Sequence, residues 1–177
     1  MPEQVVILDA RAIHRVLTRI AHEIVERNEA SNHVAVIGIQ RGGVHLADRL
    51  GALLQGIWGH PIPVGRLDVN MHRDDLDHHA APSLRPTVIP FDLAGRTVVL
   101  VDDVLFSGRT TRAALDALND FGRPRRVQLA VLVDRGHREL PVKADFVGKN
   151  VPTGAKERVE VKLKEDGGED TVLLERS

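Results

Sequence analysis

Residues 98–110 decide the fold, and they read Val98-Val99-Leu100-Val101-Asp102-Asp103-Val104-Leu105-Phe106-Ser107-Gly108-Arg109-Thr110. Four apolar, mostly β-branched residues predict a buried strand, and two adjacent carboxylates follow them. A short loop with Ser, Gly and Thr comes next, and residues 111–121 have the pattern of a helix. A helix N-terminus offers free backbone N–H groups and the positive end of a dipole. The stretch therefore predicts a strand, an acidic pair, an anion-binding loop and a helix in succession.

The acidic pair and the loop suit different parts of one ligand. Carboxylates such as Asp102 and Asp103 favour hydroxyl groups or Mg²⁺, whereas the loop favours a phosphate. The stretch lacks the Gly-Lys-[Ser/Thr] of a Walker loop and the three spaced glycines of a dinucleotide site. A phospho-receiver domain carries its acids after the first strand, with no phosphate loop directly behind them. A sugar phosphate such as ribose 5-phosphate is the ligand that best fits both halves.

A second turn of the same kind occurs earlier in the chain. Residues 34–39 form a continuous apolar run typical of a buried parallel strand, and Gln40-Arg41-Gly42-Gly43 follows it before a helix. Many strand-to-helix turns need glycine for backbone reasons alone, so this turn is weak evidence by itself. Two anion loops in one small domain indicate a ligand with two separate phosphate groups.

The remaining pattern predicts an α/β fold with a central, mainly parallel sheet flanked by helices. Asp9 is a candidate N-cap for an amphipathic helix over 10–28, and residues 127–133 read as another buried strand. Ligands of such sheets bind beyond the carboxyl ends of the strands, so we expect the loops 38–43, 102–110 and 134–138 to converge. Further strands are expected at 5–8 and 61–71, ordered structure is expected to resume at 87–91, and alternation over 158–175 predicts a C-terminal β-hairpin.

One long polar segment interrupts this pattern. Residues 72–86 are charged and punctuated by proline, which is typical of a flexible lid loop. Its histidines, His72, His78 and His79, have a spacing that fits no standard zinc pattern.

Composition sets broad limits. The 177 residues suit one domain spanning 1–177, and the 42% apolar content is ordinary. With a net charge of −1, any polyanionic partner must find a local patch. The absence of cysteine excludes thiol chemistry, and no apolar run reaches the roughly 18–20 residues of a membrane span. We expect a cytoplasmic protein.

Residues 98–110 resemble the motif by which type I phosphoribosyltransferases bind phosphoribosyl pyrophosphate (PRPP). Nearly the whole chain is similar to one member family, PyrR, whose members are bifunctional pyrimidine-operon attenuation regulators and uracil phosphoribosyltransferases. The narrower resemblance is carried by Thr18-Arg19-Ile20-Ala21-His22-Glu23, Arg73-Asp74-Asp75-Leu76, Ile89-Pro90-Phe91-Asp92, Val133-Asp134-Arg135-Gly136-His137-Arg138-Glu139-Leu140-Pro141 and Gly148-Lys149-Asn150-Val151-Pro152-Thr153.

The resemblance implies that uracil and PRPP react, with Mg²⁺, to give UMP and diphosphate. Asp102 and Asp103 would hold the ribose hydroxyls directly or through water and Mg²⁺, and Arg73 on the lid would neutralise the leaving diphosphate. Asp103 would also support cationic character at the ribosyl carbon. Gln40, Arg41 and Gly42 are implied to bind the diphosphate, and Ser107, Gly108, Arg109 and Thr110 the ribose 5-phosphate. The implied uracil-binding residues are Val133, Asp134, Arg135, Gly136, His137 and Arg138.

The second role of the family is to bind pyrimidine-operon leader mRNA in the presence of uridine nucleotides such as UMP and UTP. The residues implied to bind RNA are Thr18, Arg19, His22, Arg27, Arg138 and Lys149. Only 3% of the residues are aromatic, so phosphate and shape contacts would dominate over base stacking. The resemblance also implies a homodimer or a larger homo-oligomer.

The chain departs from the family at three places. Gln40 stands where Thr or Lys is usual, His72 stands where Tyr is common, and Gly154-Ala155-Lys156 follows Pro152-Thr153 in place of Ser and a basic residue. Two alternatives therefore stay open: an RNA-binding regulator that senses PRPP or UMP with little or no catalysis, and a salvage enzyme without RNA binding.

Overall fold

The computed structural model describes residues 2–29, 33–73 and 86–176. Strands and helices alternate through most of this length, as the apolar pattern predicts. The elements are β1 (Glu3–Leu8), α1 (Ala10–Arg27), β2 (Val34–Ile39), α2 (Val44–Trp58), β3 (Val64–Leu67), η2 (Asn70–His72), β4 (Thr97–Leu105), α3 (Arg109–Leu118), β5 (Arg126–Asp134), β6 (Phe146–Asn150), β7 (Arg158–Lys162), η3 (Lys164–Asp166) and β8 (Thr171–Arg176).

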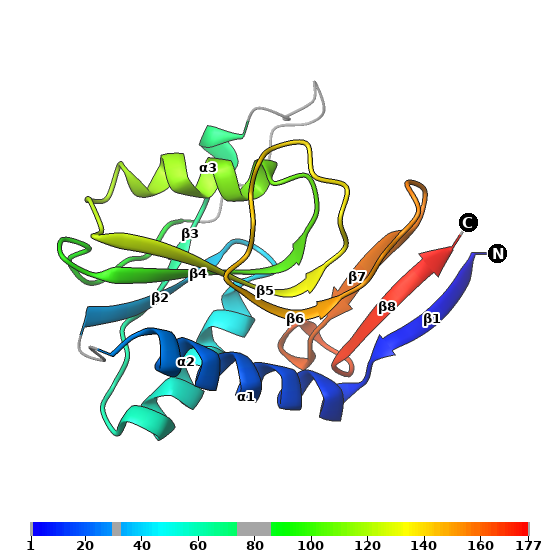
Figure 1. Cartoon of the computed structure of the whole chain (residues 1–177), viewed down its shortest axis with the longest axis horizontal. Helices are drawn as coiled ribbons and strands as arrows, with labels where there is room; N and C mark the ends of the chain where they lie inside the picture. Colours follow the sequence, from blue (N-terminus) through cyan, green and yellow to red (C-terminus); the bar gives the residue numbers. More distant parts are fainter. Residues whose placement is uncertain (1, 30–32, 74–85, 177) are drawn as a thin grey trace.

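A five-stranded sheet forms the centre of the molecule, with strand order β3-β2-β4-β5-β6. Its strand pairs are all parallel. Helices α1 and α2 cover one face and α3 covers the other (Figure 1). The α/β fold predicted from the sequence is therefore confirmed.

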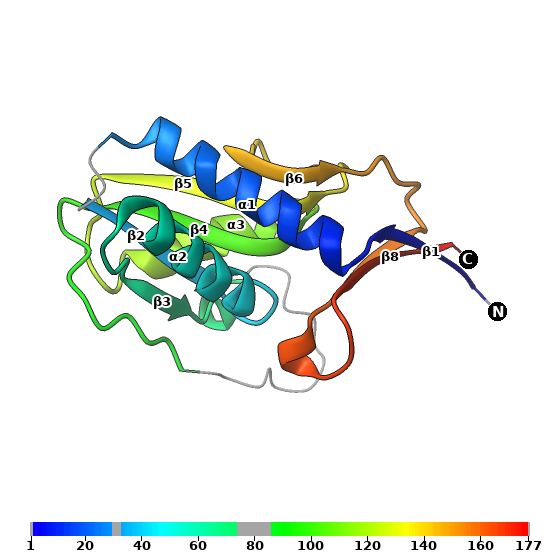
Figure 2. The ribbon, with the colours of Figure 1, turned by 90° about the horizontal axis from the view of Figure 1, so that it is seen from below.

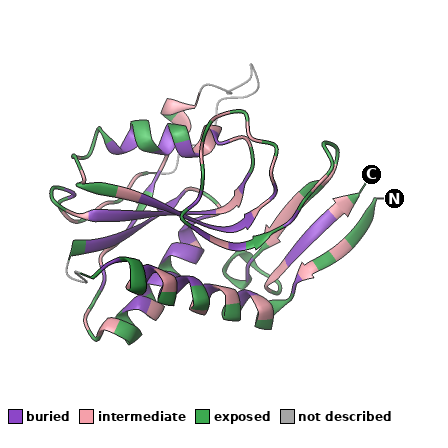
Figure 3. Ribbon diagram, in the orientation of Figure 1, coloured by how far each residue is buried: buried purple, intermediate pink, exposed green. Residues whose placement is uncertain are grey.

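Strand β4 is the middle strand because both of its faces are apolar. Val99 and Val101 pack with α1 and α2, whereas Val98 and Leu100 pack with α3. All four side chains are buried, as are most residues of β2 and β5 (Figure 3). This burial on both sides explains the continuous apolar runs in the sequence.

The two chain ends meet in a second sheet. It is antiparallel, with the order β1-β8-β7, and Figure 2 shows it as a ribbon that extends beyond α1. The pair β7 and β8 is the predicted C-terminal hairpin. The pairing of β1 with β8, which joins Val5 to Leu174, is an addition that the sequence did not indicate.

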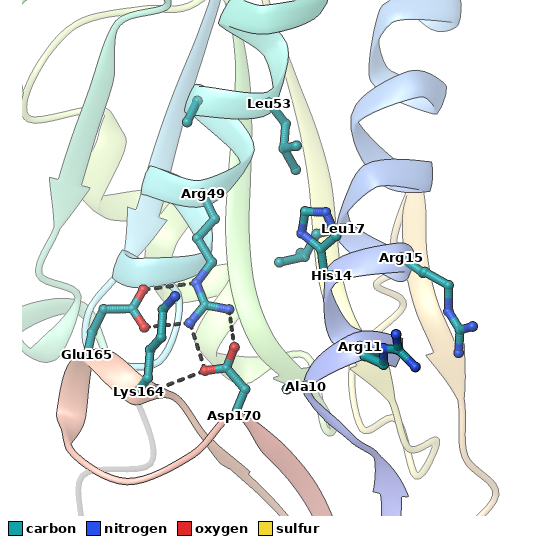
Figure 4. A pocket seen from close by; sticks show the side chains of 11 residues that line it. Ala10, Arg11, His14, Arg15, Leu17, Arg49, Leu53, Lys164, Glu165 and Asp170 are labelled. Atoms are coloured by element: carbon teal, nitrogen blue, oxygen red, sulfur yellow. Dashed lines mark hydrogen bonds and ion pairs between the residues drawn. The ribbon is translucent and has the colours of Figure 1, made fainter.

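Arg49 of α2 contacts the turn between β7 and β8, while Leu8, Leu163 and Val172 pack this second sheet on the main core. Its guanidinium donates to Glu165 Oε2 at 2.9 Å and to Asp170 Oδ1 and Oδ2 at 2.8 Å (Figure 4). Hydrogen bonds from Arg49 hold the pKa of both carboxyl groups below their ordinary values. A cavity of about 1050 Å³ opens beside this cluster, between α1 and α2, and none of its lining residues was predicted to bind a ligand.

Several element boundaries differ from the predicted ones. The predicted strand 61–71 is only β3, because the Asp68 carboxylate accepts a hydrogen bond from the Asn70 N–H and turns the chain. Residues 87–91 form a single bridge, from Val88 to Arg66. Asp9 is the predicted N-cap of α1, with Oδ1 accepting from the Ala12 N–H at 2.8 Å. Most of the predicted lid, residues 74–85 with His78 and His79, lies outside the described residues.

In the described part of the chain, no helix is both long and apolar enough to cross a membrane.

Candidate active site

Three loops meet at the carboxyl ends of β2, β4 and β5. Backbone hydrogen bonds connect two of them: the Arg135 N–H donates to the Leu105 carbonyl at 3.1 Å, and the Glu139 and Leu140 N–H groups donate to the Ser107 carbonyl at 2.9 and 3.0 Å. The third loop, after β2, touches the acidic pair through Gly42. The structure thus brings together the three segments that carry most of the candidate site residues.

The acidic pair lies at the end of β4. Asp102 is buried, and its Oδ1 accepts from the Asp103 N–H at 2.9 Å. Asp103 Oδ1 accepts from the Val104 N–H at 2.7 Å. A Cβ atom added at Gly42 would overlap the Asp103 carboxylate, so this approach requires glycine. The turn after β2 and the acidic pair therefore form one unit.

Charge within this unit is incompletely balanced. Burial raises the pKa of the Asp102 carboxyl well above its ordinary value, the Asp103 charge adds to this effect, and Arg73 opposes it. A bound cation would relieve the repulsion. The described residues contain no cluster of three or more His, Cys, Asp or Glu groups placed to hold a metal. A metal here would have one or two carboxylate ligands and take the others from substrate and water, as Mg²⁺ commonly does.

The loop between β4 and α3 forms the second part of the site. Gly108 is the N-cap of α3 and has φ 93°, which glycine tolerates without strain. Ser107 Oγ accepts from the Arg109 N–H at 3.2 Å. A cavity of about 350 Å³ opens at this helix N-terminus, lined by Arg73, Asp102, Val104, Leu105, Phe106, Ser107, Gly108, Arg109, Thr110, Thr111 and Glu139. One cavity therefore joins the acidic residue, the anion loop and Arg73.

The turn after β2 presents its polar groups outward. Gln40 Nε2 donates to the Pro86 carbonyl at 2.8 Å, while the Arg41 side chain is exposed. Gln40 therefore connects this turn to Pro86, the last residue of the predicted lid.

The loop after β5 is held by side chains that point inward. Asp134 Oδ1 accepts from the Gly136 N–H at 3.0 Å, and Oδ2 accepts from Arg138. His137 has φ 63°, and its Nε2 lies 2.5 Å from the Thr153 carbonyl. Val133 is fully buried in the core, so its side chain contacts the interior and not a ligand cavity.

Five residues that line the cavity at the start of α3 were not predicted as site residues: Val104, Leu105, Phe106, Thr111 and Glu139. Glu139 Oε2 also accepts from Arg109 Nη2 at 3.3 Å. The signal for Phe106 was its position between the acidic pair and Ser107, and the signal for Glu139 was its place in the segment 133–141 that carries the family resemblance.

The residues predicted to bind RNA fall into two groups. Thr18, Arg19, His22 and Arg27 lie on α1, with Lys149 on the neighbouring strand β6, whereas Arg138 belongs to the loop after β5. Helix α1 packs directly on β6. Arg19 Nη2 donates to the Gly148 carbonyl at 2.5 Å, and Arg27 pairs with Asp145 at 3.2 Å. His22 and Lys149 are exposed.

Comparison with known proteins agrees with this geometry. Residues 4–165 match the family described as "Phosphoribosyl transferase domain". The chain is 60% identical over 173 residues to "Bifunctional protein PyrR" of Roseiflexus sp. (strain RS-1), covering 97% of this chain and 94% of the relative. It is 62% identical over 169 residues to the protein of that name from Streptomyces coelicolor, covering 95% and 88%.

Solved structures show the same fold at low identity. A hypoxanthine phosphoribosyltransferase from Staphylococcus aureus superposes with a TM-score of 0.66 at 14% identity, covering 85% of this chain and 79% of that one. The enzyme of that name from Trypanosoma cruzi, in complex with IMP, gives 0.65 at 20% identity, covering 85% and 77%. The predicted family is confirmed, and the chain belongs to the phosphoribosyl transferase domain family and, within it, to the bifunctional PyrR proteins.

Proposed function

We propose that this protein is a uracil phosphoribosyltransferase that makes UMP and diphosphate from uracil and PRPP. The observation that carries the proposal is the contact between the acidic pair and both anion loops: Gly42 lies against Asp103, and Asp102 lines the cavity at the start of α3. A sugar with a phosphate at one end and a diphosphate at the other matches that order. The bond between uracil N1 and the ribosyl carbon forms, the bond to diphosphate breaks, and the N1 proton is lost.

Groups of different charge bind different parts of PRPP. The α3 N-terminus, with Ser107, Gly108, Arg109 and Thr110, binds the 5-phosphate of the ribose through backbone N–H groups and the helix dipole. Asp102 and Asp103 hold the ribose hydroxyls. The Asp103 carboxylate also stabilises positive charge at the ribosyl carbon as the leaving group departs. No covalent intermediate with the protein is required.

The diphosphate end is assigned to cationic and backbone groups of two segments. Gln40, Arg41 and Gly42 hold the diphosphate. Arg73, which is half-buried and lines the same cavity as Asp102, neutralises the charge that develops on it. Arg73 belongs to the predicted lid, so its placement and the exclusion of water are expected to change together.

The acidic pair is the part of the chain that fits Mg²⁺. Asp102 and Asp103 would hold the ion directly or through water, and the raised pKa of Asp102 is the effect that a bound cation would reverse. When bound, Mg²⁺ supplies positive charge to the diphosphate oxygens and orients PRPP.

The acceptor base is assigned to the loop after β5. The residues 133–138 that resemble the family's uracil site are followed directly by Glu139 and Leu140, whose N–H groups donate to the Ser107 carbonyl of the phosphate loop. Of these, Asp134, Gly136 and Arg138 form one hydrogen-bonded turn that leaves backbone groups to recognise the base edge.

We further propose that the protein regulates pyrimidine genes by binding leader mRNA when UMP or UTP is present. The relatives are named bifunctional, and the neighbouring elements α1 and β6 carry Thr18, Arg19, His22, Arg27 and Lys149, with Arg138 on the loop after β5. A homodimer or larger homo-oligomer in the cytoplasm would repeat these residues and lengthen the surface offered to RNA.

The enzyme proposal is tested by measuring UMP and diphosphate formed from uracil and PRPP with Mg²⁺. We expect the Asp102→Asn/Asp103→Asn variant to lose nearly all activity, while Arg123→Ala, an exposed residue beyond α3, keeps it. Binding of PRPP without diphosphate release would instead indicate a non-catalytic sensor. No product with uracil, orotate, adenine, hypoxanthine or guanine would overturn the assignment as a transferase.

The RNA proposal is tested by a gel shift with pyrimidine-operon leader RNA in the presence and absence of UMP. We expect binding that UMP strengthens and salt weakens. An unchanged affinity after adding UMP would contradict the regulatory role and leave the salvage enzyme as the function.

A further inference from the structure

An exposed aromatic ring lies at the junction of the acidic pair and the phosphate loop. Phe106 is 43% exposed, although its neighbour Leu105 is buried in the core. Phe106 lines the same cavity as Arg73, Asp102 and the residues that begin α3. A large apolar residue therefore lines a cavity whose other walls are mostly polar.

The ring is held in place on its other sides. The guanidinium carbon of Arg135 lies 4.2 Å from the ring centroid, a cation–π contact, and the His137 ring meets it edge-on with centroids 6.2 Å apart. Arg135 is buried, and its Nη2 donates to the Glu157 carbonyl at 2.8 Å. Its Nε has no hydrogen-bond partner among the described residues, so its contact with Phe106 is a main interaction of this group.

Hydrogen bonds to the backbone carbonyls of Leu105 and Phe106 also restrain the position of the ring. The Phe106 carbonyl accepts from Arg138 Nη1 at 3.0 Å, and the preceding Leu105 carbonyl accepts from the Arg135 N–H at 3.1 Å. The backbone at Phe106 is thus hydrogen-bonded to the base-recognition loop after β5, and it continues directly into the phosphate loop. A preorganised ring loses little entropy when a ligand packs on it.

We infer that Phe106 forms an apolar wall of the base subsite and packs against the pyrimidine ring of uracil and of UMP. This inference rests on the proposed function. With the ribose on Asp102 and Asp103 and its phosphate at the α3 N-terminus, the base attached to the ribose lies between the phosphate loop and the loop after β5. Phe106 occupies that place, and an aromatic face or edge favours a planar heterocycle.

The contribution of Phe106 to binding of the base can be measured separately from binding of the sugar phosphate. Phe106 carries no charge and no hydrogen-bonding group, so it adds affinity for the base and none for the phosphate. UMP and ribose 5-phosphate differ by the base, and the ratio of their affinities isolates the contribution of this wall.

The test is calorimetric titration of the full-length protein with UMP and with ribose 5-phosphate. We expect Phe106→Ala to weaken UMP binding roughly five- to hundredfold, the range of one base–aromatic contact, and to change ribose 5-phosphate binding less than about twofold. Phe106→Tyr keeps the ring and should stay close to the wild type. In the enzyme assay, Phe106→Ala should raise KM for uracil by a similar factor and leave KM for PRPP unchanged.

Phe121→Ala is the matched control, because Phe121 is 46% exposed and lies beyond the C-terminal end of α3, outside the site. It should bind both ligands as the wild type does. Equal losses of UMP and ribose 5-phosphate affinity in Phe106→Ala, or no loss of either, would overturn the inference and leave the proposed function standing. A wild type that binds neither ligand would overturn the proposed function as well.

Discussion

Arg138 and Asp134 form a short ion pair, with Nη2 and Oδ2 2.5 Å apart. The same guanidinium donates from Nε to the Val142 carbonyl at 2.8 Å and from Nη1 to the Phe106 carbonyl at 3.0 Å. One side chain thus connects the end of β5, the far end of the loop that follows it, and the end of β4. Burial would raise the pKa of the Asp134 carboxyl, but the hydrogen bonds from Arg138 and the Gly136 N–H hold it below its ordinary value.

We predict that Arg138 positions the base-recognition loop. Arg138→Ala removes three hydrogen bonds and leaves Asp134 unpaired, so KM for uracil should rise at least about tenfold and the free energy of unfolding should fall by about 1–3 kcal/mol. Arg138→Lys should recover only part of the loss, because an ammonium cannot reproduce the planar fork. Steady-state kinetics and urea denaturation measure both effects. Loss of RNA binding with an unchanged KM for uracil would show instead that Arg138 is an RNA contact.

Gly42 offers a test of the contact between the diphosphate turn and the acidic pair. A methyl group at this position would overlap the Asp103 carboxylate, so Gly42→Ala should displace Asp103 and lower kcat/KM for PRPP at least about tenfold. Gly56→Ala is the matched control: Gly56 lies on α2 and a Cβ there meets nothing within 4 Å. That variant should keep full activity and gain about 0.5–1 kcal/mol of stability. Normal kinetics in Gly42→Ala would refute the contact.

Much of the fold was predictable because burial leaves a clear pattern. Strand β4 needed apolar side chains on both faces, and the carboxylates at its end could only face a polar site. The pairing of β1 with β8 left no such trace, since it joins segments from opposite ends of the chain, at Glu3 and Arg176. The contact of Arg49 with Glu165 and Asp170 could not be predicted either, because no sequence pattern indicates which charged residues far apart in the chain form an ion pair.

The site was predictable where a sequence motif determines the backbone conformation, and less so where tertiary contacts determine the direction of a side chain. Asp102 and Ser107 of the motif line one cavity together with Arg73, which was singled out by its resemblance to the family. Arg138 is different, because an arginine in a polar loop looks the same in sequence whether it faces solvent or its own backbone. Phe106 is different again, because an apolar residue after a buried strand has the same sequence pattern whether it joins the core or lines a ligand cavity.

Lys149 offers the sharpest test of RNA binding. Its side chain is exposed on β6 beside α1, whereas Arg19 donates to backbone carbonyls of the same strand. Lys149→Ala should weaken leader RNA binding uniformly and lower the slope of log affinity against log salt by about one, with uracil phosphoribosyltransferase activity unchanged. Lys162→Ala, an exposed residue of β7, is the control and should leave the gel shift unaltered. An unchanged salt slope in Lys149→Ala would place the RNA elsewhere.

Arg49 makes stability depend on pH. The pKa values of Glu165 and Asp170 lie below their ordinary 4.5 and 3.8, because Arg49 donates hydrogen bonds to both ionised groups. A lowered folded-state pKa gives stability that is present above the unfolded value and is lost as the pH falls through the folded value. Arg49→Met leaves two carboxylates facing each other without their cation, so at pH 7 it should unfold about 2 kcal/mol more easily than the wild type.

Because protonation of the two acids removes what Arg49 stabilises, the difference in unfolding free energy between wild type and Arg49→Met should shrink as the pH falls below the ordinary pKa values of the two acids. Urea denaturation at a series of pH values measures it. The cluster holds the turn between β7 and β8 against α2, so hydrogen exchange in β7 and β8 should rise in the variant before exchange in β4 does. A stability difference that is constant with pH would mean that apolar packing holds the two sheets together without a contribution from Arg49.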